Sequence, residues 1–310
     1  MDFQNERTEE GAFVRQADIF RDWVTPDGVS GFPAEKGRYH LYASLACPWA
    51  HRTLIVRKLK GLETVIGLTI VDPVRDERGW AFRSGPGYTE DPINHFQYLN
   101  EAYLASHPQF KGRVTVPVLW DKKTKRIINN SEDDITRMFN SAFNAFTLSP
   151  LDLYPEALRF EIDQINALIY PNVNDGVYKA GFATSQKIYE TCVRRLFATL
   201  DQLEERLAAQ RYLIRGHLTE ADWRLFPTLI RFDTVYYLHF KCNIRRIVDY
   251  PNLCRYLRDL YQHDHVAETV NFDHIKRHYY ITHTEINPTQ IVPVGPELDL
   301  TSPHGREKLA

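Results

Sequence analysis

The chain lacks an uninterrupted apolar run of the roughly 20 residues that a membrane-spanning helix needs. Its polar start, MDFQNERTEE, resembles neither a secretory signal nor an Arg- and Ser-rich transit peptide. A net charge of −2 provides no global field to recruit nucleic acid or an acidic membrane surface. From these absences we expect a protein that neither spans a membrane nor binds nucleic acid.

Cysteine is also scarce. The four cysteines, Cys47, Cys192, Cys242 and Cys254, are too widely spaced to form a disulfide framework, which favours a reducing compartment. We therefore expect a cytoplasmic protein. The composition, with 43% hydrophobic and 25% charged among 310 residues, is typical of a globular protein of one large or two ordinary domains.

One cysteine stands in a reactive context. Residues 39–61, YHLYASLACPWAHRTLIVRKLKG, run from a β-like segment through a short turn into an amphipathic helical pattern. Cys47 begins that helix, and Pro48 falls in its first turn, where a missing N–H costs nothing. Unpaired N–H groups and the helix dipole favour a thiolate there. Ala50 stands where a second cysteine would complete a C-x-x-C motif, so an external small thiol is the simplest resolving agent.

The first half of the chain alternates strands and helices. The expected strands span 39–43, 64–71, 115–120 and 126–129, and the expected helices span about 49–60 and 95–106 and resume near 131. A helix links the first two strands, which should be parallel, whereas a tight turn makes the last two an antiparallel hairpin. The irregular residues 72–92 form a loop of a length that is usually functional.

Every pattern after residue 155 predicts helix. The expected helices span 157–170, 185–210, 222–239 and 252–261. Thr219 and Asp222 form a capping box, and from residue 273 the chain reads as an irregular tail rich in His, Tyr and Pro. The fold class is therefore α/β plus all-α, with residues 1–38 as an N-terminal extension.

Several blocks of the chain resemble one family. They are LYASLACPWAHRT, the loop around Trp80, TVPVLWD, NNSEDDITRMFNSAF, NDGVYKAGFATSQ and HYYITHTEINPTQIVPVGP. In this order, from about residue 13 to 297, they resemble the glutathionyl-hydroquinone reductases, the xi class of glutathione transferases. The resemblance implies a thioredoxin-like, glutathione-binding domain at 39–150 and a helical substrate domain at 151–310 that includes the tail. It also implies a homodimer with glutathione as co-substrate and no metal.

The resemblance implies that Cys47 attacks the sulfur of a glutathionyl-hydroquinone. The hydroquinone leaves, and a second glutathione resolves the Cys47–glutathione mixed disulfide and releases glutathione disulfide. Tyr178 and Tyr279 match tyrosines that hydrogen-bond the aromatic substrate, a role that the adjacent Tyr280 shares or owns in an alternative assignment.

The resemblance also implies a glutathione site. Its residues are Trp80, Arg113 or its neighbourhood, Val116, Pro117, Ser131 and Glu132. The backbone of Val116, before an expected cis Pro117, would pair with the cysteinyl amide of glutathione. The family's usual pair at the third helix is Glu-Ser, whereas this chain has Ser131-Glu132. Either Glu132 contacts the amino group of glutathione in the reversed order, or the grip is looser.

Other interpretations stay open. An omega-like thiol transferase or dehydroascorbate reductase would share Cys47 and the glutathione site but needs no tyrosine cluster. A non-catalytic binding module would need no reactive thiol. Trp80 equally fits a residue that plugs its loop onto the core, and the three tyrosines fit ordinary packing. The histidines between 263 and 283 are irregularly spaced for zinc. The basic residues Arg52, Arg57, Lys58 and Lys60 favour a solvated helix face, although His51 or Arg52 lies near enough in sequence to assist the thiolate.

Overall fold

The computed structural model of the chain describes residue 6 and residues 8–309. Its contacts group into two compact units. The first contains Gln16–Asp152 and Glu268–His283, and the second contains Leu153–Ala267 with the described residues before Gln16 and after His283. In the part of the chain that the structure describes, no helix is long and apolar enough to cross a membrane.

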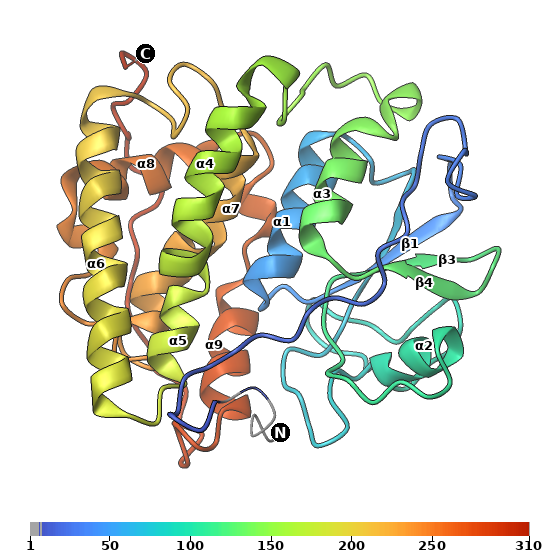
Figure 1. The fold of residues 1–310 in the computed structure, drawn as a ribbon, viewed down its shortest axis with the longest axis horizontal. Coiled ribbons are helices and arrows are strands. Elements are labelled where there is room, and N and C mark those ends of the chain that lie inside the picture. The colour runs from blue at the N-terminus through green and yellow to red at the C-terminus, as the bar shows by residue number, and fades with distance from the viewer. Residues whose placement is uncertain (1–5, 7, 310) are drawn as a thin grey trace. The chain divides into compact units, whose positions relative to one another are not determined.

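A four-stranded sheet forms the centre of the first unit (Figure 1). Its strands are β1 (Tyr39–Ala43), β2 (Gly67–Ile70), β3 (Val118–Asp121) and β4 (Arg126–Asn129), in the order β2-β1-β3-β4. β1 pairs in parallel with β2, and β3 is antiparallel to both β1 and β4. All five residues of β1, which lies between β2 and β3, are buried, as in a strand of a sheet that is covered on both faces. The predicted parallel pair and hairpin are confirmed.

Helices cover both faces of this sheet. The helices of the first unit are α1 (Pro48–Leu59), α2 (Leu99–Ser106), α3 (Glu132–Ser141) and α9 (Phe272–Thr282), with the 3₁₀ turns η2 (Asn144–Phe146) and, largely, η7 (Ala267–Thr269). Figure 1 shows α1 and α3 on one side and α2 on the other. The long segment between β2 and α2 contains only isolated bridges, as predicted. Buried Asp91 organises it by accepting hydrogen bonds from the Tyr42 hydroxyl (3.0 Å) and from the N–H groups of Ile93 (3.1 Å) and Asn94 (3.0 Å).

The second unit is helical. Its elements are η3 (Glu156–Leu158), α4 (Arg159–Ile169), η4 (Tyr170–Asn174), α5 (Gly176–Gly181), α6 (Gln186–Ala209), α7 (Glu220–Arg231), η5 (Phe232–Tyr236), η6 (Ile247–Asp249) and α8 (Pro251–Gln262). The capping box is confirmed, because the Asp222 carboxylate accepts from Thr219 N (2.8 Å) at the start of α7. The fold class, α/β plus all-α, is confirmed.

The C-terminal residues are fastened to this unit by Arg306. Its Nη2 donates to the carbonyl oxygen of Leu207 (3.0 Å) in the last turn of α6 and to those of Gln210 (2.6 Å) and Arg211 (2.9 Å) just after the helix. The last carbonyls of a helix, Leu207 among them, have no partner within the helix, and a cation is favourable at that end of the dipole. Arg306 thus joins Gln262, which donates to the Leu300 carbonyl (2.8 Å), in holding the end of the chain.

Two secondary-structure predictions from the sequence are wrong. Residues 272–282 are not irregular but form α9, which is capped by the Asn271 side chain accepting from His274 N (2.9 Å). This helix clusters with the first unit rather than with the helical one. The predicted helix 222–239 ends as α-helix at Arg231 and continues as the π-helical turn η5. The extension 1–38 is also divided between the two units, since residues from Gln16 onward cluster with the sheet.

Candidate active site

Cys47 lies where the chain passes from β1 into α1. Ser44 shapes the turn, because its Oγ accepts from Ala46 N (3.2 Å) and its carbonyl accepts from Cys47 N (3.3 Å). Cys47 is the N-cap residue of α1 and Pro48 is its first helical residue, as predicted. The first turn of this fully described helix contains no acidic residue. The N–H groups and the positive end of the dipole therefore favour negative charge on the sulfur.

The neighbour of the sulfur is the backbone of Val116. The Sγ of Cys47 lies 3.6 Å from the Val116 carbonyl oxygen, a distance typical of a weak S–H donor. The Val116–Pro117 peptide bond is cis, as expected from the resemblance. Ala50 is completely buried. The structure thus brings Val116 to Cys47 and places core packing where a resolving cysteine would stand.

The start of α3 is tied to α1 by an ion pair. Ser131 is the N-cap residue of α3, is buried, and its N–H donates to Asn129 Oδ1 (2.8 Å). Glu132 accepts from Arg52 Nη1 at 2.9 Å, and both side chains are nearly excluded from solvent. The carboxylate that the swapped Ser131-Glu132 order brings to this helix is therefore held by α1.

The prediction of a solvated basic face on α1 is wrong. Besides Arg52, the guanidinium of Arg57 donates to the Ile66 carbonyl (2.8 Å), and Lys58 pairs with Glu268 (2.8 Å). Lys60 is 1% exposed and donates to the Leu151 carbonyl at 2.6 Å. The amphipathic pattern located the face correctly but could not show that other segments of the first unit cover it.

The Trp80 side chain is buried rather than exposed to solvent. Its ring stacks on His278 of α9 with the centroids 5.0 Å apart and the planes at 15°, and the Arg75 guanidinium lies 5.0 Å from its centroid. With 4% of its surface exposed, Trp80 offers little surface to a ligand in this state. Arg113 lies in the segment before β3, where its N–H donates to Gln16 Oε1 (2.7 Å).

Tyr279 and Tyr280 lie on α9 and are 1% and 4% exposed. Tyr279 packs edge-on against His278 (5.2 Å) and His283 (5.4 Å). Burial raises the pKa of Tyr280 to about 12, so this phenol stays protonated over the physiological range. The sequence missed the helix that joins these tyrosines to the first unit, although Asn271 at its start is an N-cap signal.

Tyr178 belongs to the second unit, on α5. Its ring packs against Phe240 (5.3 Å) and Tyr236 (5.9 Å). The guanidinium of Arg15 lies 5.1 Å from its centroid and donates to Asp175 Oδ1 through Nη2 (3.0 Å) and Nε (3.1 Å). Burial lowers the pKa of Arg15, but Asp175, Tyr170 and Tyr178 outweigh it and raise that pKa overall. Sequence reasoning missed Arg15, because nothing local marks a cation that pairs across 160 residues.

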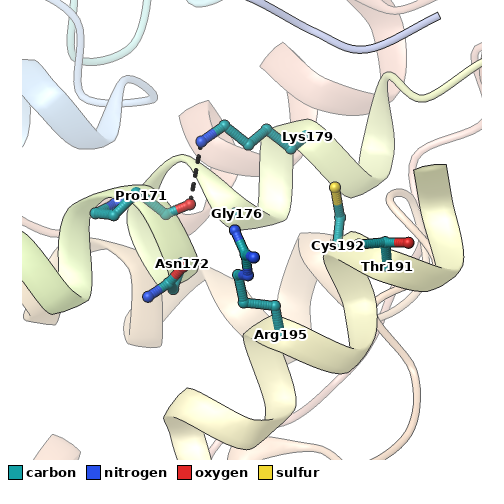
Figure 2. A pocket seen from close by; sticks show the side chains of 7 residues that line it. All are labelled: Pro171, Asn172, Gly176, Lys179, Thr191, Cys192 and Arg195. Carbon is teal, nitrogen blue, oxygen red and sulfur yellow. Dashed lines mark hydrogen bonds between the residues drawn. The ribbon is translucent and has the colours of Figure 1, made fainter. Parts of the chain in front are cut away.

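A small cavity of about 50 Å³ opens in the second unit (Figure 2). Its lining is Pro171, Asn172, Gly176, Lys179, Thr191, Cys192 and Arg195, which includes none of the predicted site residues. Lys179 is already paired with Asp175 (3.3 Å) and donates to the Pro171 carbonyl (3.2 Å). Burial raises the pKa of the Cys192 thiol. The cavity therefore combines a lysine whose charge is balanced by Asp175 with a protonated thiol.

Two histidines of the tail hold the loop between β2 and α2 by hydrogen bonds. His274 and His278 bind loop carbonyls, with Nε2 of His274 2.7 Å from Pro86 O and Nδ1 of His278 2.7 Å from Pro73 O. Over the described ranges, 6 and 8–309, no three His, Cys, Asp or Glu side chains form a group that could hold a metal ion.

Family models match both halves of the chain. The model described as the glutathione S-transferase N-terminal domain matches residues 46–142, and the C-terminal domain model matches residues 186–259. Among curated proteins, the glutathionyl-hydroquinone reductase YqjG of Escherichia coli is 54% identical over 304 residues, covering 96% of this chain and 93% of its own length. The glutathionyl-hydroquinone reductase PcpF of Sphingobium chlorophenolicum is 52% identical over 286 residues, covering 92% and 90%.

Solved structures agree with these matches. The glutathione-bound structure of YqjG from Escherichia coli K-12 superposes with a TM-score of 0.92 at 54% identity, covering 94% of this chain and 96% of its own. The xi glutathione S-transferase of Phanerochaete chrysosporium superposes with a TM-score of 0.90, also at 54% identity, covering 94% and 99%.

Proposed function

Because the chain belongs to the glutathionyl-hydroquinone reductases, the xi class of glutathione transferases, we propose that it reduces glutathionyl-hydroquinones to hydroquinones with glutathione. The observation that carries this proposal is Cys47 at the N-terminus of α1, beside the Val116 carbonyl, with buried Ala50 in place of a resolving cysteine. A monothiol of this kind needs an external thiol to complete its cycle.

In the first half-reaction, the Cys47 thiolate attacks the sulfur of the conjugate. A sulfur–sulfur bond forms, and the bond between sulfur and the aromatic carbon breaks. The carbon keeps the electron pair and takes a proton. Carbon is a poor leaving group, but in the keto tautomer of the hydroquinone it lies next to a carbonyl, so the electrons are received as an enolate. Phenol donors at the ring oxygen stabilise that charge, which is the role we assign to Tyr178 and Tyr279.

In the second half-reaction, glutathione thiolate attacks the glutathionyl sulfur of the mixed disulfide. Glutathione disulfide leaves, and Cys47 is regenerated as a thiolate. We assign glutathione binding to the backbone of Val116 with Pro117, and to Trp80, Arg113, Ser131 and Glu132. The N–H groups at the start of α3 suit a carboxylate of the peptide, and Arg52 fixes the position of Glu132. The reversed pair thus still places one carboxylate and one hydroxyl at this helix start.

The experiment is a turnover assay with glutathionyl-menadiol and glutathione, following menadiol and glutathione disulfide. We expect turnover by the wild-type protein and none by Cys47→Ala, with Cys192→Ala as the control that stays active. Burial holds the Cys192 thiol in its protonated form by raising its pKa. Absence of wild-type turnover, or turnover that survives Cys47→Ala, would refute the proposal.

The second candidate is an omega-like thiol transferase or dehydroascorbate reductase, favoured by a 48% identical relative named glutathione S-transferase omega-like 2 in Schizosaccharomyces pombe. The relative rates on different substrates distinguish the two candidate activities. A reductase of hydroquinone conjugates turns over glutathionyl-menadiol faster than a glutathione-mixed disulfide or dehydroascorbate. The reverse order would favour the second candidate, and binding of glutathione without any turnover would favour a non-catalytic module.

We further propose a cytoplasmic location and a homodimeric state. The cytoplasm supplies the reduced glutathione that the cycle consumes. The dimer proposal rests on the family resemblance, and light scattering of the purified protein tests it.

A further inference from the structure

Helix α9 holds the loop between β2 and α2 at three points. His274, His278 and Thr282 follow one another at intervals of four residues and therefore share a face of the helix. His274 Nε2 and His278 Nδ1 each lie 2.7 Å from a loop carbonyl oxygen, of Pro86 and Pro73 respectively. Thr282 Oγ1 accepts from Arg75 N at 3.3 Å. A carbonyl only accepts, so both histidines donate an N–H here.

The loop backbone approaches the helix closely at Gly87. Its φ is +81°, and a Cβ at this position would lie 3.1 Å from His274 Nε2 and 3.3 Å from Asn271 Nδ2. A side chain there would push against the start of α9. Glycine thus allows the contact both through its backbone conformation and through its lack of a side chain.

His278 uses its ring face as well as its Nδ1. The face stacks on Trp80 (5.0 Å, 15°), and the ring edge meets Tyr279 (5.2 Å, 80°). The same imidazole therefore contacts the tryptophan assigned to glutathione and the tyrosine assigned to the aromatic substrate. Its hydrogen bond to Pro73 O fixes the plane of the ring.

The segment leading into α9 is attached to the catalytic helix. His51, fully buried on α1, has Nε2 2.7 Å from Thr269 Oγ1, and Lys58 pairs with Glu268 (2.8 Å). His51 also donates its backbone N–H to the Cys47 carbonyl (3.0 Å). The chain of contacts from Cys47 through α1 to α9 and Trp80 is thus continuous within the first unit.

We propose that His278 is a positioning residue, which aligns Trp80 and Tyr279 with Cys47 through its donor to Pro73 and its stacked ring. The inference rests on the proposed function, because it assigns a purpose to residues of that site. His278 takes no part in bond making. It sets the geometry in which bound glutathione and the aromatic ring meet the sulfur. A misplacement of reacting groups by about 1 Å can lower a rate by about 100-fold.

Two substitutions separate the two contacts. His278→Asn keeps a donor near the position of Nδ1 and removes the stacked ring, whereas His278→Phe keeps a ring and removes the donor. We expect both to raise the KM for glutathione and to lower kcat on glutathionyl-menadiol by about tenfold or more. The rate of Cys47 alkylation by iodoacetamide, which needs neither glutathione nor a tyrosine, should stay within about twofold, and an unchanged circular dichroism spectrum shows that the variants are folded. Exposed His217 provides the matched control, and His217→Phe should match wild type in every measurement.

A double-mutant cycle with Trp80→Ala decides whether His278 acts through the tryptophan. We expect His278→Asn to raise the KM for glutathione in the wild-type background and to change it little in the Trp80→Ala background. Fully additive effects, or wild-type kinetics for both His278 variants, would overturn the inference while wild-type turnover still upheld the proposed function. Absence of wild-type turnover would instead defeat the proposed function.

Discussion

Substituting Ala50 by cysteine should change the agent that resolves the mixed disulfide. Cys47 and Ala50 are three positions apart at the start of α1. Helical geometry, with a rise of 1.5 Å per residue and a Cα radius of about 2.3 Å, places such residues about 5 Å apart between Cα atoms. A disulfide spans about 4.4 to 6.8 Å between Cα atoms. The distance therefore permits a disulfide between Cys47 and a cysteine introduced at position 50.

The extent of glutathione release from Cys47 follows from competition between the thiols that can attack the mixed disulfide. A thiol on the same helix has an effective concentration of about millimolar or more, so it captures the mixed disulfide when free glutathione is absent. The new sulfur enters a position that is completely buried, and overpacking of this kind costs about 1 to 3 kcal/mol. Ala50→Ser adds an atom at the same place without redox chemistry and is the control for packing.

The assay is a single turnover with one equivalent of glutathionyl-menadiol and no free glutathione, read by intact-protein mass spectrometry. Wild type and Ala50→Ser should each carry one glutathione on Cys47. Ala50→Cys should release that glutathione and lose two hydrogens as the internal disulfide closes. The same burst of menadiol is expected from all three proteins. A glutathione adduct that persists on Ala50→Cys would refute the assigned role of position 50.

Three further predictions concern the substrate site and the stability of the two units. Tyr178→Phe and Tyr279→Phe should each lower kcat on glutathionyl-menadiol by about 10²- to 10⁴-fold and spare reduction of a glutathione-mixed disulfide; equal loss on both substrates would point to misfolding. Arg38→Met should raise the pH midpoint of acid unfolding followed by circular dichroism. Burial acts to raise the pKa of Asp121, but hydrogen bonds from Arg38, Thr124 and Lys123 N lower it overall. Asp121 therefore contributes stability above its unfolded pKa of about 3.9, and this stability is lost as the pH falls through the lowered folded pKa; an unchanged midpoint would contradict this account. Arg306→Met should lower the free energy of unfolding in urea by about 2 kcal/mol, since three carbonyl hydrogen bonds are lost. A wild-type midpoint in urea would show that the C-terminal anchor contributes nothing.

Local patterns were enough for much of the fold. The strand at 39–43 and the one at 126–129 have the predicted bounds, and the helix after Cys47 begins at Pro48. These elements are encoded by runs of apolar and aromatic residues and by proline at the first helical position, and the start of α7 is encoded by its capping box; all of these signals act over a few residues. The prediction of an irregular tail failed because histidines and tyrosines are weak helix formers. In the folded protein, packing of α9 against the loop between β2 and α2 compensates for that weakness.

The sequence by itself was enough to predict the reactive group. A cysteine before a proline at a strand-to-helix junction, without a partner three residues on, is a local arrangement that needs no further context. The family resemblance of the motifs then identified glutathione as its co-substrate. Neither step depends on contacts that are distant along the chain.

Only the tertiary structure decided how the surrounding residues are held. Arg52 meets Glu132 across 80 positions, His278 meets Pro73 across 205, and Arg15 reaches Asp175 across 160. The energy of such pairs depends on burial and mutual geometry, which a sequence pattern does not contain. Cys47 can therefore be recognised from its neighbours along the chain, whereas the contacts that hold Trp80 and Tyr279 exist only in the folded protein.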